Sequence, residues 1–255
     1  MNSKGPGSPH PSPAHGGLLP QGHLQPLQAV LFDMDGTLVE TEQYWGEAMC
    51  DLARELGGSM SPAARERTVG TSMRVAMGVL YADLGVRRDE VDLQGDVRWV
   101  EDRTAELMAA GGIDWRPGAR ALLAAVRDAG VATALVTTTP RRLAAPVLQR
   151  ITGDLGGNPF DVTVCGDEAP ARKPDPAPYL QAMAALGVEA GGCLVIEDSQ
   201  VGIAAGLAAG ATVLGVPSLQ RMQPLPGLVV RHGLVGLTAG QLGDLLRVEA
   251  GGAGQ

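Results

Sequence analysis

Short apolar runs alternate with helix-length segments along the chain from about residue 118 onward. Such runs indicate buried strands, and segments with apolar residues on one helical face indicate helices that cover a sheet. Their regular alternation with short connections is typical of parallel βαβ units. The sequence therefore predicts an α/β fold, a doubly wound parallel sheet of at least five strands. The expected strands are Ala29–Phe32, Val131–Val136, Asp161–Cys165, Cys193–Ile196 and Thr212–Val216, and the expected helices are Arg120–Ala129, Arg141–Ile151, Asp175–Leu186 and Val201–Ala209.

The segment 42–113 departs from this pattern. Its apolar residues recur at helical spacing, as in Trp45, Met49, Leu52 and Leu56, and it contains no β-rich run. We expect an inserted all-helical domain, called the cap here, that closes over the end of the first strand. The expected division is a disordered leader at 1–26, an α/β core at 27–41 and 114–248, the cap at 42–113 and a disordered tail at 249–255.

The leader has a composition that cannot bury enough apolar surface to order itself. Residues 1–26 hold six prolines and five glycines but one charged residue, Lys4. His10, His15 and His23 are spread along it, and we interpret them as incidental rather than as a metal site.

Composition narrows the class of protein. A net charge of −8 gives no reason to expect nucleic acid or an anionic membrane surface as a partner. No apolar run reaches the roughly 18 residues of a membrane-spanning helix. The three cysteines form no CxxC pair, which argues against a disulfide framework or a zinc site and suits a reducing compartment. We therefore expect a cytoplasmic monomer that acts on a small molecule.

Two carboxylates follow the first expected strand. Asp33 and Asp35 come directly after Ala29–Phe32, and the turn Gly36-Thr37 follows them. In an open α/β sheet, ligands bind outside the carboxyl ends of the strands, so both acids should project into a crevice. Acidic turns also arise as helix caps and Asx-turns, so this pair alone does not decide between a catalytic and a structural role.

Hydroxyl side chains close the next expected strand. Thr137 follows Val136 directly, and its hydroxyl can hydrogen-bond a phosphoryl oxygen. A threonine before a helix can instead cap that helix, and Thr139, just before Pro140, suits this role. We assign the ligand role to Thr137 and the capping role to Thr139.

A lysine and two further acids follow later strands. Lys173 lies in a loop stiffened by Pro174, although most lysines are solvated surface groups. Glu197 and Asp198 end the apolar run Leu194–Ile196 and must face the crevice, because burying them would cost several kcal/mol. Asp198 has an alternative role as the N-cap of the following helix.

Together these side chains describe a site for a hard cation and a phosphate. Asp33, Asp35, Glu197 and Asp198 supply oxygen ligands without a cysteine or histidine cluster, which suits Mg²⁺. A lysine and a hydroxyl beside such a cation form a phosphate-binding arrangement. Two aspartates at one phosphate allow one to attack as a nucleophile and the other to act as acid and base.

The ordered set of motifs closely resembles the haloacid dehalogenase superfamily of phosphohydrolases. The helical segment after the first motif looks like the cap of its β-phosphoglucomutase-like branch, on a Rossmann-like core, and the resemblance spans about residues 28–218. The motifs that carry it are Asp33-x-Asp35-Gly36-Thr37, Leu38-Val39-Glu40-Thr41-Glu42, Thr137, Lys173-Pro174-Asp175-Pro176 and Ile196-Glu197-Asp198-Ser199-Gln200-Val201-Gly202-Ile203-Ala204-Ala205.

The resemblance implies a role for each motif. Asp33 would attack phosphorus to form an aspartyl-phosphate, and Asp35 would protonate the leaving oxygen and then activate water. The backbone carbonyl of Asp35 would also bind Mg²⁺. Thr137 and Lys173 would hold the phosphoryl oxygens. Asp198, helped by Glu197, would complete the metal site.

Three alternatives to a phosphatase stay open. A dehalogenase of this superfamily does not need the second acid, Asp35. The mutases usually have Val in place of Thr37, His in place of Trp45 and a Lys-Gly-x-Ser-Arg loop, whereas this chain has Val69-Gly70-Thr71-Ser72-Met73-Arg74. A phosphoacceptor module that only signals would carry no long helical insert. The phosphatase is favoured over all three.

The substrate is expected to be a small phosphorylated metabolite, a sugar or polyol phosphate. The resemblance places the specificity residues in the cap, where Arg74 is either a partner for a second anionic group or an ordinary exposed arginine. The candidate substrate-binding residues are Gly36, Thr138, Gly70, Thr71, Arg74 and Trp45, with Tyr44 as a further candidate.

Overall fold

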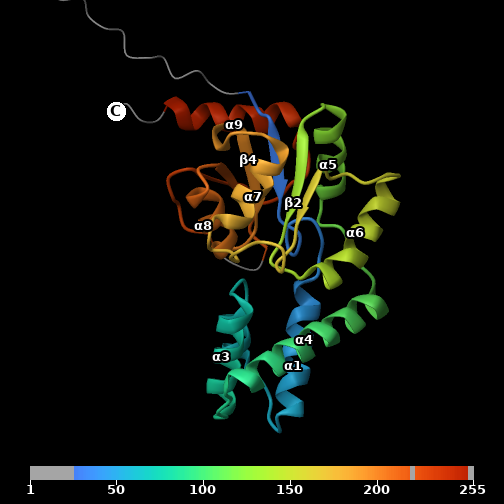
Figure 1. Cartoon of the computed structure of the whole chain (residues 1–255), viewed down its shortest axis with the longest axis vertical. Helices are drawn as coiled ribbons and strands as arrows, with labels where there is room; N and C mark the ends of the chain where they lie inside the picture. The colour runs from blue at the N-terminus through green and yellow to red at the C-terminus, as the bar shows by residue number, and fades with distance from the viewer. Residues whose placement is uncertain (1–25, 219–221, 252–255) are drawn as a thin grey trace, which may run out of the picture.

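The computed structural model describes residues 26–218 and 222–251, and these residues build a six-stranded parallel sheet with a helical domain at one end (Figure 1). The strand order is β3-β2-β1-β4-β5-β6, so the order reverses between β1 and β4. The strands are β1 Ala29–Phe32, β2 Ala132–Val136, β3 Val162–Val164, β4 Cys193–Glu197, β5 Thr212–Gly215 and β6 Leu228–Val230.

Alternate residues of the strands build two apolar layers. Val30 and Phe32 of β1 pack with α5, α6 and α9, whereas Ala29 and Leu31 pack with α7 and α8 on the other face. The sheet is therefore covered on both faces, which is why its strands are apolar throughout. These helices are α5 Ala119–Asp128, α6 Arg141–Leu155, α7 Ala177–Leu186, α8 Gln200–Ala208 and α9 Ala239–Gly251.

The predicted fold class is confirmed, with two differences in its elements. The sheet has a strand beyond the five expected, β6, whose three residues follow a proline-rich stretch and are too short to show a period. Helix α9 continues to Gly251, so residues 249–251, which were expected in the disordered tail, belong to a helix. Glu249 and Ala250 both have high helix propensity, which suits this extension.

Four helices between β1 and α5 form the cap. Their own apolar cluster includes Met49 and Leu52 of α1, Met77 and Leu80 of α3 and Val100 of α4. Serine side chains begin two of them, since Ser61 and Ser72 accept from the backbone N–H groups of Ala64 and Val75. The helices are α1 Glu42–Glu55, α2 Pro62–Thr68, α3 Met73–Leu84 and α4 Glu90–Gly111.

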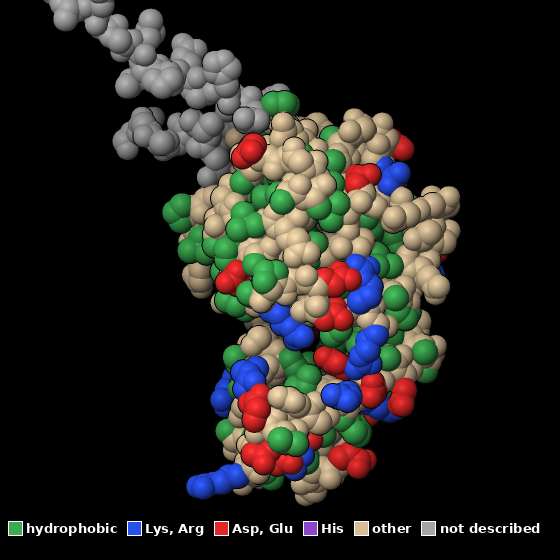
Figure 2. Space-filling model, viewed as in Figure 1, with side chains coloured by type: hydrophobic (Ala, Val, Ile, Leu, Met, Phe, Trp, Pro, Cys, Tyr) green, Lys and Arg blue, Asp and Glu red, His purple; other side chains and the backbone are tan. Residues whose placement is uncertain are grey.

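Charged side chains of both signs gather where the cap meets the core (Figure 2). Arg142 of α6 contacts two acids of α4, with Nη2 2.6 Å from Glu101 Oε2 and Nη1 2.6 Å from Asp102 Oδ1. These ion pairs link the two parts of the molecule beside the carboxyl end of the sheet.

Three expectations from composition have different outcomes. The leader, with His10, His15 and His23, lies outside the described residues except for Pro26. Within 26–218 and 222–251, no helix has the length and apolar character needed to cross a membrane. All three cysteines are free thiols, and Cys165 and Cys193 are buried.

Candidate active site

The two acidic motifs meet at the reversal of strand order. Asp33 directly follows β1 and Asp198 directly follows β4, and the Asp33 N–H donates to the Ile196 carbonyl over 3.0 Å. The reversal of order opens a crevice at the carboxyl edge of such a sheet. The apolar strands thus hold both acids at one point, as the sequence predicts.

Lys173 is the buried cation of this site. Its Nζ donates to Asp33 Oδ1 at 2.7 Å, to Glu197 Oε1 at 2.6 Å and to the Val136 carbonyl at 2.8 Å. The Tyr179 hydroxyl also donates to Glu197 Oε1, at 2.7 Å. All three N–H groups of the ammonium are therefore used, and Lys173 is fixed against Asp33.

Glu197 anchors Lys173 more than it faces the crevice. Its side chain is fully buried. Its Oε1 accepts from Lys173 and Tyr179, and its Oε2 accepts from the Ser199 hydroxyl at 3.0 Å and, more weakly, from the Ser199 N–H. Both oxygens are committed to protein donors, so a direct role on a cation falls mainly to Asp33 and Asp198.

The site holds more negative than positive charge. Asp33, Glu197 and Asp198 offer carboxylate oxygens within 4.8 Å of one another, and Lys173 is the cation that contacts this group. Burial, followed by the Glu197 charge, raises the pKa of Asp33 to about 8, although Lys173 opposes the shift. Burial and the Asp33 charge also raise the pKa of Asp198. A divalent cation held by oxygen ligands would relieve this repulsion, so the residues fit Mg²⁺.

The loop after β1 packs directly against Asp198. Thr37 is buried and its hydroxyl lies 3.4 Å from Asp198 Oδ1. Gly36 has a φ of +79°, and a Cβ at this position would overlap the Asp198 carboxylate. Gly36, expected to bind substrate, instead allows close approach to Asp198, and it does not line the main cavity described below.

We expect Gly36→Ala to weaken Mg²⁺ binding at least tenfold, because the added methyl group displaces Asp198. The left-handed backbone should also lower the free energy of unfolding by about 1–2 kcal/mol. Gly57→Ala is the matched control, since Gly57 has a φ of +83° with open space around it. Calorimetric Mg²⁺ titration of both variants separates the two effects, and equal affinities would contradict the assigned role of Gly36.

The side chain of Asp35 accepts hydrogen bonds from three threonines. Its Oδ1 accepts from the Thr41 hydroxyl, and its Oδ2 accepts from Thr139 Oγ1 at 2.6 Å and from Thr137 Oγ1 at 3.4 Å. Thr41 immediately precedes α1, where the chain enters the cap. The acid is thus held by donors from both the core and the cap junction.

The capping role predicted for Thr139 is wrong, and the alternative role of Asp198 as an N-cap is not what the structure shows. Pro140 is the N-cap residue of α6, and the Asp167 carboxylate accepts from the Arg141 N–H at 2.8 Å instead. Ser199, not Asp198, caps α8 by accepting from the Gly202 N–H at 3.1 Å. The Thr139 prediction fails because Asp35, which lies far away in the sequence, accepts from the hydroxyl that local sequence would assign to a cap.

Thr139→Val should lower kcat about tenfold, because Asp35 loses its shorter core donor. Thr152→Val, on α6 and outside the site, is the matched control and should leave kcat unchanged. Steady-state kinetics on one phosphate ester decides the point. Equal kcat values for the two variants would show that Thr139 does not position Asp35.

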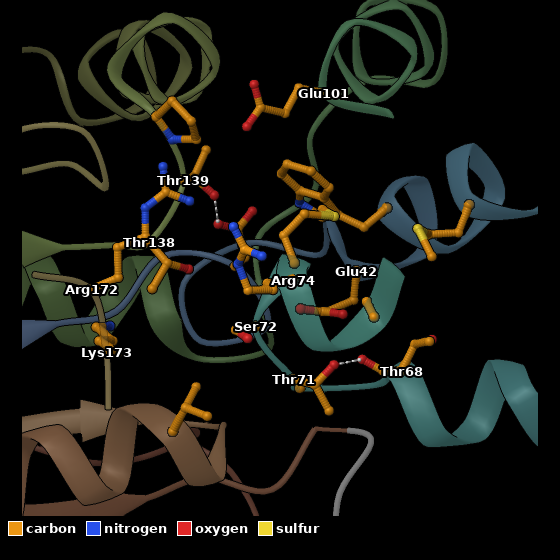
Figure 3. Close-up of a pocket in the computed structure, with 18 of the residues that line it drawn as sticks. Glu42, Thr68, Thr71, Ser72, Arg74, Glu101, Thr138, Thr139, Arg172 and Lys173 are labelled. Atoms are coloured by element: carbon orange, nitrogen blue, oxygen red, sulfur yellow. Dashed lines mark hydrogen bonds between the residues drawn. The ribbon is translucent and has the colours of Figure 1, made fainter. Parts of the chain in front are cut away.

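A cavity of about 510 Å³ lies between the core and the cap, in front of Asp35 and Lys173. In Figure 3, Thr138 and Lys173 lie on one side of it, and Glu42, Thr68 and Thr71 lie on the other. One end of a ligand here would meet the acids, and the other end would meet the cap. The lining includes Thr138, Gly70, Thr71, Arg74 and Trp45, all expected from the sequence.

Residues 27–210 match the family model of the haloacid dehalogenase-like hydrolases. The chain belongs to this family. It is 30% identical over 197 residues to protein CbbY of Rhodobacter capsulatus, covering 75% of this chain and 86% of that protein. It is 33% identical over 185 residues to a phosphorylated carbohydrates phosphatase of Thermotoga maritima, covering 72% and 82%.

The fold agrees with this assignment. A crystal structure of CbbY from Rhodobacter sphaeroides in complex with phosphate superimposes with a TM-score of 0.70 at 26% identity, covering 82% of this chain and 96% of that one. These comparisons confirm the predicted family and the predicted fold. They also confirm the prediction that the protein is a hydrolase of phosphoric monoesters.

Several residues of this hydrolase differ from expectation. Tyr44 does not line the cavity, and its hydroxyl donates to the Gly112 carbonyl at 2.8 Å. Arg74 lines the cavity and also pairs with Glu90, with Nη2 2.6 Å from Oε1. Arg74 is thus an exposed arginine with an acidic partner in the cap, and its role toward a second anionic group of a substrate stays a prediction. Thr137 directly follows β2 and contacts Asp35, Lys173 contacts Asp33, and the phosphate-binding role of both stays a prediction.

Sequence patterns gave no role in the cavity to four charged residues that line it: Glu42, Arg65, Glu101 and Arg172. Glu42 is the first residue of the predicted cap, so a search of the cap entry would have reached it. Arg65 lies on a short helix with charged neighbours and has no distinguishing local signal. Arg172 directly precedes Lys173, and its Nε donates to the Gly166 carbonyl at 3.1 Å.

Proposed function

We propose that the protein is a Mg²⁺-dependent phosphatase that hydrolyses a small sugar or polyol phosphate through an aspartyl-phosphate on Asp33. The main support is the geometry around Asp33, whose Oδ1 lies 2.7 Å from Lys173 Nζ beside Asp198. A carboxylate fixed between a buried ammonium and a cation site can approach a phosphoryl group, because the surrounding positive charge offsets their repulsion. Bound Mg²⁺ would supply part of that charge, held by Asp33, Asp198 and the Asp35 carbonyl.

In the first step, an Asp33 carboxylate oxygen forms a bond to phosphorus while the bond from phosphorus to the leaving oxygen breaks. Lys173 and the Thr137 hydroxyl bind the phosphoryl oxygens as charge redistributes onto them. Protonated Asp35 gives its proton to the leaving oxygen, so an alcohol departs.

In the second step, the Asp35 carboxylate accepts a proton from water, which attacks phosphorus. The bond between phosphorus and Asp33 breaks, inorganic phosphate forms and both acids return to their starting states. Thr41 and Thr139 keep the Asp35 carboxylate directed at the cavity through both steps. Asp33 therefore acts as nucleophile and Asp35 as acid and base.

The proposed substrate class rests on the cavity and on the relatives. A cavity of about 510 Å³ accommodates a sugar-sized leaving group. One relative is named for phosphorylated carbohydrates. Three free cysteines suit a cytoplasmic location.

The test is phosphate release from a panel of hexose and hexitol phosphates, with Mg²⁺ and with a chelator in excess. The proposal expects stoichiometric phosphate and free sugar, lost on chelation and regained with Mg²⁺. Phosphate that stays on an isomerised sugar would identify a mutase. Binding of these esters with no turnover would identify a non-enzymatic phosphate-binding module.

A further inference from the structure

One face of α1 supplies the cap side of the cavity. Glu42, Trp45 and Met49 all line the cavity, and their spacing of three, four and seven residues places them on one helical face. Gly46 lies on the same face, one turn after Glu42. The face thus offers a carboxylate, an indole and a thioether, with a gap at Gly46.

Arg65 of α2 occupies that gap. A Cβ on Gly46 would overlap the Arg65 guanidinium, so the glycine lets this group lie directly against α1. Arg65 Nη1 also lies 3.4 Å from the Thr68 hydroxyl. The guanidinium lines the cavity, and no carboxylate lies within ion-pair distance of it among the described residues. Its remaining donors are available to a ligand.

Glu42 is the acid beside this guanidinium. In Figure 3 its side chain extends into the middle of the cavity. Within the described part of the chain, no hydrogen bond or ion pair involves its carboxylate. Burial and the Asp35 charge raise the pKa of Glu42 to about 7, and Arg65 opposes the shift. Near neutral pH the group can therefore both accept and donate a hydrogen bond.

These charges favour hydroxyl groups over a second phosphate. A second phosphate at this end of the cavity would lie close to Glu42 and would repel it. Arg65 and Arg74 offer limited compensation, because the Glu42 charge acts against that of Arg65 and Arg74 already pairs with Glu90. A hydroxyl-rich chain instead suits this end of the cavity, because the Glu42 carboxylate accepts hydrogen bonds and the Arg65 guanidinium donates them. The guanidinium lies at Gly46, one turn along α1 from Glu42. Trp45 would cover the carbon atoms of the chain.

We propose that Glu42 and Arg65 form a leaving-group subsite that selects monophosphates of polyols and sugars against bisphosphates. Glu42 accepts a hydrogen bond from one hydroxyl and Arg65 donates to a neighbouring one. Gly46 is a positioning residue that keeps Arg65 in place. This subsite rests on the proposed function, because it acts on the leaving group of that reaction.

The test compares kcat/KM for a hexitol phosphate, a hexose bisphosphate and phenyl phosphate, which lacks hydroxyls. Wild type should prefer the hexitol phosphate to both others. Glu42→Gln and Arg65→Gln should each lower kcat/KM for the hexitol phosphate about 10- to 100-fold more than for phenyl phosphate. The loss should be largely in KM. Glu42→Gln should also raise relative activity on the bisphosphate.

Two further variants separate recognition from folding. Gly46→Ala should reproduce the selectivity loss of Arg65→Gln while keeping the arginine. Arg67→Gln, exposed on the same helix and outside the cavity, should match wild type. Equal losses on hexitol phosphate and phenyl phosphate, or a wild-type preference for the bisphosphate, would overturn the subsite. No hydrolysis of any ester by wild type would instead overturn the proposed function.

Discussion

Asp33→Asn should abolish hydrolysis of phosphate esters, with a fall in kcat of about a thousandfold or more. An amide cannot form the bond to phosphorus, although its oxygen can still accept from Lys173. The folded state should survive, because the change removes one of three crowded carboxylates and leaves Glu197 to pair with Lys173. Phosphate release and thermal unfolding measure the two effects.

A control separates loss of the nucleophile from general damage to the site. Asp33→Asn should still bind inorganic phosphate with Mg²⁺ in a calorimeter, since Lys173, Thr137 and Asp198 remain. Residual turnover within tenfold of wild type would contradict nucleophilic attack by Asp33.

Lys173→Met should destabilise the protein by about 3–5 kcal/mol and lower kcat/KM at least a hundredfold. The Lys173 side chain is 1% exposed and contacts both Asp33 and Glu197. Its removal leaves buried carboxylates without their cation, while Met preserves most of the packing. Burial lowers the pKa of Lys173, but Asp33 and Glu197 more than offset this effect, so the ammonium stays charged. Urea unfolding measures the stability loss.

A second substitution tests the electrostatic origin of that loss. Glu197→Gln in the Lys173→Met background removes a carboxylate that the first change leaves unpaired. The double variant should therefore recover part of the stability without recovering activity. A Lys173→Met protein within 1 kcal/mol of wild type would show that the buried network contributes little.

The strands that carry the candidate site were predictable because their signals are local. β1 and β4 are short apolar runs, and Asp33 directly follows the first while Asp198 directly follows the second. The parallel topology then brings Asp33 and Asp198 together without further information. The cap was equally visible, because a long helical period interrupts the alternation of strands and helices.

The features of the site that were not predicted depend on contacts between residues far apart in the sequence. Thr139 was predicted to cap a helix from its local position, yet it donates to Asp35, 104 residues earlier. Gly36 was expected to bind substrate, but its lack of a side chain matters because Asp198 packs against it. Arg65 and Gly46 meet between two helices of the cap, and neither residue carries a local signal of that contact.

The most direct measurement combines a rapid burst with identification of the phosphorylated residue. Asp35→Asn lacks the base for the second step, but an activated aryl phosphate needs no acid in the first. Mixing the two with Mg²⁺ should therefore release one aryl alcohol per enzyme in a burst. Borohydride reduction after an acid quench should convert residue 33 to homoserine, detected by mass spectrometry. A missing burst with no modified residue, or a phosphate trapped at another side chain, would contradict phosphoryl transfer to Asp33.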